Sequence, residues 1–481
     1  MAARWSVVPS AIRLTVLALL ALSGWGTRTT TTAAEPSTLR VGAAAVELVA
    51  DDAMVIGGGI GPGRTAGQEG KLRAVAVVLE LPVHIVGQSS SSPVTTAAAT
   101  AAESGANKLA IVACDVLMLN RDLLDPVVTQ ITERHGIPAA NILINCTHTH
   151  HAPSTVTVHG YARDEEFCRR VQQAIAAAVA AADKNLIDGC RFDFRLGEES
   201  SVGQNSRLLL GDGSIFWIGP HDDAVRPTGP FDPELPVLAF RGPQDQLIAL
   251  LFNHSTHTIG TRQPGRSPAF YGLAAQELEA ELGGVVSFLE GASGSTHNLT
   301  LNAAEMVIRI KAAVNGALAQ AQPRPVTRLA ALKRPFAYRV RKFDEADEDT
   351  AVSVYCRRRA PQGADEIIRV FRQQREVLAP HQGQERSTWV QAVMIGDVAL
   401  VGVPAEFFTM LGQDIKRRSP YRYTYVAELA NDWIGYLPDR KAFELGGYQT
   451  WTGLHSLAEP GTGERMVDAA VELLEELHAG R

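Results

Sequence analysis

Two distant apolar segments of the chain both end in histidines, and this feature restricts the folds that the sequence can adopt. The run at 142–144 leads into His148 and His150, and the run at 250–252 leads into His257. Short apolar runs are typical of strands that are buried on both faces. In an α/β sheet such strands end at a common edge, where binding sites form. The sequence therefore predicts a sheet edge at which histidines from distant segments meet.

The spacing of the first histidines indicates what they can do. In a strand, His148 and His150 share one face with Cα atoms about 6.6 Å apart, while His151 points away. Two imidazoles at this spacing can share a metal ion, or one can bind the metal while the other contacts a substrate. A zinc site in a hydrolase needs three or four nitrogen or oxygen ligands and one position open for water. Composition does not identify the further ligands, and a polar strand end without metal is the alternative.

Strand-like and helix-like segments alternate along the chain. The apolar runs at 74–79 and 109–113 predict buried strands, whereas apolar positions recur every four residues at 167–179, as on one face of a helix. The charge-rich segment 343–380 is interpreted as a solvated helical excursion. These patterns predict an α/β protein with one large catalytic domain at 35–481, in which mixed sheets are flanked by helices.

The loop Ile56–Gly61 contains three consecutive glycines. It lacks the spacing and the preceding strand of a dinucleotide-binding fingerprint. We interpret it as a turn that lets the backbone approach another group closely, because glycine has no side chain to prevent this.

Residues 1–34 have the layout of a secretory signal peptide. Arg4 and Arg13 precede the apolar stretch 14–22, and a Thr/Ala tract then ends in two alanines. The apolar stretch is too short for a permanent membrane span, although an uncleaved anchor is the alternative. We therefore expect a secreted or periplasmic protein.

Charge and cysteine content exclude several classes of protein. The first 34 residues hold three arginines and no acidic residue, so their removal takes the net charge from −7 to −10. An acidic chain without a basic stripe is not expected to bind nucleic acid. Five cysteines are too few for a disulfide scaffold, and their odd number leaves at least one free thiol. Contact with a membrane surface and the oligomeric state stay open.

Four segments together resemble the neutral, non-lysosomal ceramidases. The segment 147–150 is similar to the T-H-T-H segment of that family, and 253–258 is similar to its strand that ends in a zinc-binding histidine. The segment 403–410 resembles its V-P-G-E-F-T-T-M motif, and 431–438 resembles its N-x-Y-x-x-Y-x-T/P stretch. The four occur in the family's order, and the similarity spans 39–451.

The resemblance implies the fold of that family's N-terminal catalytic domain and a specific site. It implies one zinc ion per chain with four ligands, which are His148, His257, Glu406 and Tyr436. It also implies that His150 contacts the reacting carbonyl, that Arg207 binds substrate, and that the ligand Tyr436 counts among the catalytic residues. Without the resemblance, Glu406 and Tyr436 have ordinary structural interpretations as a strand-end acid and a half-buried aromatic residue.

Two departures from the family pattern affect the expected chemistry. The loop 291–298 aligns with the family's G-D-x-S-P loop, but His297 stands at the position of the serine. His297 is predicted to be a site residue, as an acid for the leaving group or as a substrate contact, and a solvent-facing loop histidine is the alternative. The sequence after Trp451 is short, so we expect no C-terminal immunoglobulin-like domain.

These features predict a zinc-dependent amidohydrolase that uses a zinc-activated water to cleave a linear amide. In a ceramide-like substrate the products are a fatty acid and a sphingoid base. One alternative is a metal-dependent amidase or esterase with a non-ceramide substrate. Another is a secreted binding protein with the same fold and a metal but no catalytic activity.

Overall fold

The computed structural model describes residues 39–82 and 107–480. The predicted signal peptide at 1–34 lies outside these residues. The described residues belong to one compact unit, and none of their helices has the length and apolarity needed to cross a membrane.

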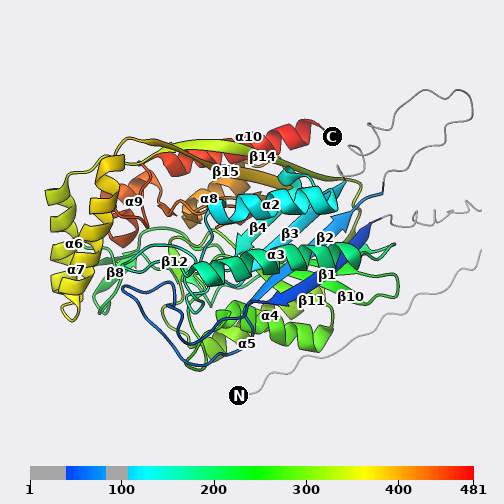
Figure 1. The fold of residues 1–481 in the computed structure, drawn as a ribbon, viewed down its shortest axis with the longest axis horizontal. Coiled ribbons are helices and arrows are strands. Elements are labelled where there is room, and N and C mark those ends of the chain that lie inside the picture. The colour runs from blue at the N-terminus through cyan, green and yellow to red at the C-terminus, as the bar shows by residue number, and fades with distance from the viewer. Residues whose placement is uncertain (1–38, 83–106, 481) are drawn as a thin grey trace, which may run out of the picture. The chain divides into compact units, whose positions relative to one another are not determined.

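The first sheet is built from the apolar runs of the N-terminal third. Its strands lie in the order β1 (Arg40–Glu47), β2 (Arg73–Glu80), β3 (Lys108–Cys114) and β4 (Ile142–Cys146). The first three strands are antiparallel, whereas β3 and β4 are parallel. Helices α2 (Arg121–His135) and α3 (Glu165–Lys184) lie side by side on one face of this sheet (Figure 1).

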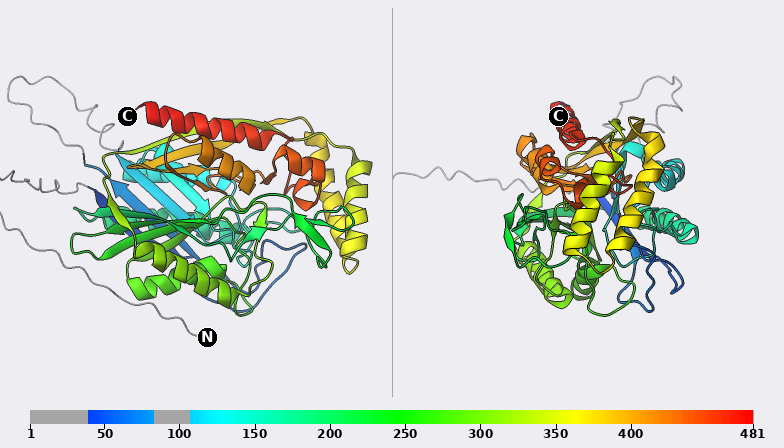
Figure 2. Two further views of the ribbon diagram at one scale, coloured as in Figure 1. Left: turned by 180° about the vertical axis from the view of Figure 1, so that it is seen from behind. Right: turned by 90° about the vertical axis from the view of Figure 1, so that its left-hand side faces the viewer.

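A second sheet carries the other histidine-bearing strand. Its five strands lie in the order β11 (Val285–Glu290), β10 (Leu247–His254), β9 (Glu234–Arg241), β5 (Arg191–Glu198) and β13 (Gln322–Arg324). Only β10 and β11 run parallel within it. Its outer face packs on α4 (Ala269–Leu282) and α5 (Ala303–Leu318), which lie along the lower edge in Figure 2.

The third sheet consists of β14 (Leu329–Arg339), β15 (Glu385–Ile395), β16 (Val398–Gly402) and β18 (Tyr423–Ala427). Strands β16 and β18 are parallel. Helices α8 (Thr409–Arg418) and α10 (Thr462–Ala479) pack against it. The inner faces of all three sheets share one apolar core, to which each sheet contributes a residue such as Ile111, Leu251 or Leu400.

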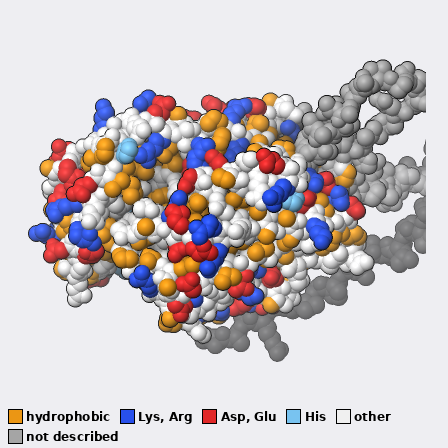
Figure 3. Space-filling model, viewed as in Figure 1, with side chains coloured by type: hydrophobic (Ala, Val, Ile, Leu, Met, Phe, Trp, Pro, Cys, Tyr) orange, Lys and Arg blue, Asp and Glu red, His pale blue; other side chains and the backbone are white. Residues whose placement is uncertain are grey.

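The charge-rich segment forms two helices, α6 (Glu345–Arg359) and α7 (Ala364–Leu378), as its pattern predicted. They lie side by side at one end of the sheets (Figure 1). They are not wholly solvated, because Tyr355 and Phe371 are buried in the core beneath them. On the face drawn in Figure 3, Lys and Arg side chains are interspersed with Asp and Glu, so this face carries no continuous basic stripe.

Short elements complete the fold, and several of them lie at the edge where the sheets meet. They include β6 (Gln204–Asn205), β7 (Leu208–Leu210), β8 (Ala224–Pro227), β12 (Thr296–His297), β17 (Glu406–Phe407), β19 (Tyr436–Leu437), α9 (Arg440–Leu445) and the 3-10 turns at Ala139–Asn141, Ala379–His381 and Tyr448–Thr450. Asn145 at the end of β4 joins the three sheets here. Its side chain accepts a hydrogen bond from Glu290 N of the second sheet and donates one to Glu428 O, just beyond the third.

Candidate metal centre

His148 lies two residues beyond β4, at the edge where the sheets meet. Its backbone adopts a left-handed conformation with φ of 60°, which turns the side chain inward, and it is 1% exposed. Its Nδ1 is 3.0 Å from Leu117 O. A carbonyl oxygen can only accept, so Nδ1 carries the proton and the Nε2 lone pair is free for a ligand.

His257 reaches the same place from the second sheet. It lies three residues beyond β10 and is buried, with Nδ1 donating to Ser293 O at 2.8 Å. Its Nε2 is therefore an acceptor as well, and it lies 3.0 Å from the Tyr436 hydroxyl. The carbonyl partner thus orients His257 in the same way as His148.

Glu406 and Tyr436 come from a two-stranded parallel ladder in which they are direct partners. Glu406 Oε2 lies 3.6 Å from His148 Nε2 and 3.5 Å from His257 Nε2. A tetrahedral zinc ion with bonds of about 2.0–2.1 Å separates its ligand atoms by about 3.4 Å. The separations of Glu406 from His148 and His257, and of Tyr436 from His257, are therefore compatible with one shared zinc ion.

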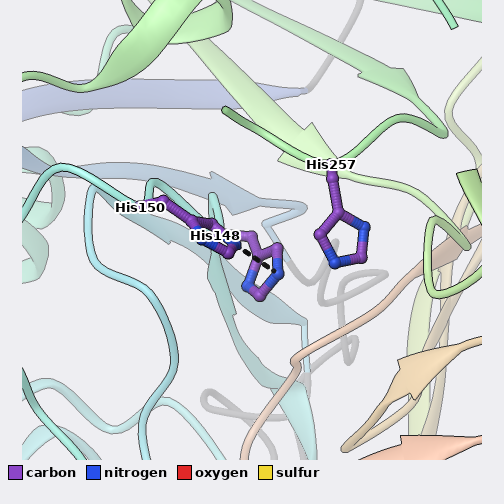
Figure 4. A group of neighbouring side chains, drawn as sticks. All are labelled: His148, His150 and His257. Atoms are coloured by element: carbon purple, nitrogen blue, oxygen red, sulfur yellow. Dashed lines mark hydrogen bonds between the residues drawn. The ribbon is translucent and has the colours of Figure 1, made fainter. Parts of the chain in front are cut away.

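His150 faces the same centre (Figure 4). Its Nε2 lies 3.2 Å from His148 Nε2, and its Nδ1 lies 3.2 Å from Gly58 O. The ligand atoms of His148, His150 and His257 all lie within 4.8 Å of one another, so these three imidazoles can hold a metal ion. His150 can thus serve as a third imidazole ligand or as a contact for a substrate bound beside the metal.

The glycine loop predicted to allow close backbone approach covers His150. A Cβ atom added to Gly58 would lie 2.4 Å from His150 Nδ1, and Gly58 has a φ of +102°. Gly58 N also donates a 2.8 Å hydrogen bond to the Tyr161 hydroxyl. His150 and the loop residues 56–57 and 59–63 together line a cavity of about 410 Å³ beside the centre.

His297 lies against the centre. Its ring stacks on that of His257 at a centroid separation of 3.9 Å and an interplanar angle of 21°. The predicted loop is locally a strand here, since His297 in β12 pairs with Gln204 of β6. The side chain is half-buried rather than solvent-facing.

Arg207 is placed differently from the other predicted site residues. It is buried, and its guanidinium donates to Gln449 Oε1 at 2.7 Å, Gly446 O at 2.6 Å and Ala442 O at 3.3 Å. These bonds hold the segment that follows β19. Burial lowers the pKa of Arg207 to about 10, so it remains charged at neutral pH.

Burial sets the charge states around the centre. It lowers the pKa of His148 to about 4, with a further lowering by nearby His257, and it lowers the pKa of His297 well below the usual range. Burial alone would raise the pKa of Glu406, but the hydrogen bond with His257 and the electrostatic influence of His148 lower it to about 2. The chain therefore presents neutral imidazoles and a carboxylate, which are the forms that bind metal.

Comparison with solved structures gives two matches over nearly the whole chain. A neutral ceramidase from Pseudomonas aeruginosa matches with a TM-score of 0.68 and 18% identity over 92% of this chain and 74% of that chain. The chain has the neutral ceramidase fold. A ceramidase complexed with C2 matches with a TM-score of 0.67 and 17% identity over 92% of this chain and 76% of that chain. No family model matches the sequence, and a search of curated proteins finds no match.

The ceramidase fold confirms two predictions from the sequence. These are the α/β class with mixed sheets and, at the level of the fold, the resemblance to neutral ceramidases. The identity of the metal, the substrate and the role of each site residue are matters of proposal.

Several residues around the candidate metal centre were not found from the sequence. Trp433 Nε1 donates to Glu406 Oε1 at 3.1 Å, and the hydroxyl of buried Tyr448 lies 2.9 Å from His159 Nε2 beside Tyr436. Trp433 lies within a segment that resembles the family, so its motif offered a signal. Nothing local distinguishes His159, because its neighbours come from distant parts of the chain.

Proposed function

We propose that this protein is a metal-dependent hydrolase that cleaves the amide bond of an N-acylated, ceramide-like substrate. The observation that carries the proposal is that Glu406 Oε2 lies 3.6 Å from His148 Nε2 and 3.5 Å from His257 Nε2. The Nδ1 groups of both histidines donate to carbonyl oxygens, so both Nε2 lone pairs face the carboxylate. A carboxylate and two lone pairs repel one another, and a cation bound among them removes the repulsion. The ceramidase fold supports an amide as the substrate class.

The donor set supports zinc as the metal. Imidazole nitrogens with a carboxylate and a phenol oxygen suit a borderline cation better than calcium or magnesium, which prefer oxygen ligands. We propose one zinc ion per chain with four ligands, which are His148, His257, Glu406 and Tyr436. A bound zinc ion polarises a carbonyl oxygen and lowers the pKa of a water molecule to about 7.

The remaining side chains are assigned to the substrate. His150, held by Gly58 O and open to the cavity, is proposed to lie beside the reacting carbonyl. Its Nε2 must take up a proton before it can donate to the carbonyl oxygen, where charge develops. His297, stacked on His257, is proposed to contact the leaving amine. Arg207 is proposed to hold residues 442–449 in place. Through these residues it is proposed to orient bound substrate. We also propose that the protein is exported, and this proposal is based on the signal peptide predicted at residues 1–34.

Metal content provides the direct test. We expect about one zinc per wild-type chain by mass spectrometry and clear loss of zinc in His148→Ala, His257→Ala and Glu406→Ala. The matched control is His151→Ala, because His151 lies in the same segment but its Nε2 accepts from Gly260 N. A wild-type protein without stoichiometric metal, or ligand variants that retain it, would contradict the proposal.

Substrate class is tested on the zinc-loaded protein. We expect release of fatty acid from ceramide vesicles and from short N-acyl amides. Cleavage of short amides or esters without release from ceramide would assign the alternative, a non-ceramide hydrolase. That outcome is favoured by His297 at the family's serine position. Absence of turnover on all of these substrates would indicate a metal-containing binding protein.

A further inference from the structure

Glu428 is a buried acid that is not part of the proposed ligand set. It follows β18 directly and is 0% exposed. Its backbone N–H donates to Glu290 O at the end of β11 at 3.0 Å. The residue therefore stands where the second and third sheets meet, behind the candidate metal centre.

The carboxylate of Glu428 joins two separate segments. Its Oε2 accepts hydrogen bonds from Ser293 N at 3.0 Å and from Phe407 N at 2.7 Å. Its Oε1 accepts from the Ser293 hydroxyl at 2.7 Å. One side chain thus accepts from three buried donors. Two of these are backbone N–H groups, which cannot donate to water instead because they are buried.

Each of the two segments carries or supports a proposed ligand. Ser293 O is the carbonyl that orients His257, at 2.8 Å from Nδ1, and Phe407 directly follows Glu406. The segments also touch each other closely. Gly294 N donates to Phe407 O at 3.0 Å, and a Cβ atom on Gly294 would lie 2.4 Å from Glu406 O.

We propose that Glu428 is a positioning residue for the metal centre. By bonding to Ser293 and to Phe407 with one oxygen atom, it sets the separation between His257 Nε2 and Glu406 Oε2, which is 3.5 Å. The inference rests on the proposed function, since the separation matters only if His257 and Glu406 bind the same metal ion. Groups that orient metal ligands typically contribute about 10–100-fold to metal affinity.

The geometry distinguishes among replacements at this position. Glu428→Ala leaves Ser293 N and Phe407 N without their acceptor, so the two segments are free to separate. Glu428→Gln keeps one carbonyl oxygen that can accept both N–H bonds. Glu428→Asp keeps a carboxyl group but retracts it from the two donors. Loss in the alanine and aspartate variants with recovery in the glutamine variant is the pattern expected of a positioning role.

The experiment measures metal binding rather than turnover. Zinc affinity of the purified full chain is determined by competition with a chromophoric chelator, and ligand geometry is followed by the visible absorption of the cobalt(II)-substituted protein. For Glu428→Ala we expect about 10–100-fold weaker zinc binding and altered cobalt bands. Glu428→Gln is expected to stay within a few-fold of wild type. If the alanine variant does not fold, Glu428→Asp is expected to show the same direction of change.

Glu199 offers a matched control elsewhere in the fold. It is also a buried glutamate, and it accepts from Val202 N at 2.7 Å and from the N–H and hydroxyl of Ser201. The hydrogen bonds of its carboxylate stay within its own loop and go to neither ligand segment, and its backbone carbonyl, which accepts from His254 Nε2 at 2.9 Å, is kept in the alanine variant. Glu199→Ala is therefore expected to lower the thermal midpoint of the apo protein while it leaves zinc affinity and the cobalt spectrum unchanged.

Two outcomes overturn the inference. One is wild-type zinc affinity and a wild-type cobalt spectrum in folded Glu428→Ala or Glu428→Asp. The other is an equal loss of affinity in Glu199→Ala, which would reveal a general effect of destabilisation. Failure of the wild-type chain to bind zinc at all would instead overturn the proposed function, so the two failures are separable.

Discussion

Replacement of Gly58 by alanine provides a sharp test of how the glycine loop supports His150. Gly58 has a φ of +102°, and its added Cβ would lie 2.4 Å from His150 Nδ1. Gly59, next in the chain, would place a Cβ with nothing within 4 Å. The two substitutions add the same methyl group to adjacent residues and differ in what that methyl group meets.

The structure sets the size of the expected effect. An ordinary carbon contact needs about 3.5 Å, so the His150 ring must retreat by about 1 Å from an alanine at position 58. A displacement of about 1 Å at a reaction centre can lower the rate by about 10²-fold. The left-handed backbone adds about 1–2 kcal/mol to the free-energy cost of holding an alanine there.

The assay compares kcat/KM for a short N-acyl amide and the midpoint of urea unfolding in both variants. We expect Gly58→Ala to lose about 10²-fold in kcat/KM and to unfold at lower urea. Gly59→Ala is expected to stay close to wild type in both measurements. Equal behaviour of the two variants would refute the reasoning, because it would mean that the loop does not confine His150.

Two further predictions concern buried charges. Arg207→Met is expected to lower the free energy of unfolding by about 3 kcal/mol, because it leaves buried carbonyl oxygens without donors; unchanged urea unfolding with a raised KM would instead indicate direct substrate binding. Burial raises the pKa of Asp115 from 3.8 to about 6, against lowering by Arg73 and Thr147, so the folded chain holds this proton more tightly than the unfolded chain. The stability from this group is present below about pH 4 and is lost as the pH rises through 6, and Asp115→Asn should remove that decline. Urea unfolding from pH 3.5 to 7 checks this, and a pH-independent difference between the two proteins would contradict it.

The strand ends that carry His148 and His257 followed from local apolar runs, because a buried strand leaves its signature in consecutive residues. Glu406 and Tyr436 entered only through the resemblance to ceramidases. Their ladder pairs residues 30 positions apart in the sequence, and no local pattern indicates which two-residue strands will meet. The role proposed for Glu428 could not be predicted from the sequence for the same reason, since its three donors come from distant segments.

The sequence by itself therefore determined the class of fold and the strands that lead into histidine. These are properties of periodicity and composition, which each segment carries alone. Only the tertiary structure decided that the Nδ1 groups of His148, His150 and His257 face carbonyl oxygens, and that Arg207 is bonded to the segment after β19. These partners are far apart in the sequence, and they meet only when neighbouring strands pair, as β3 and β4 do for Leu117 and His148 and β10 and β11 do for His257 and Ser293.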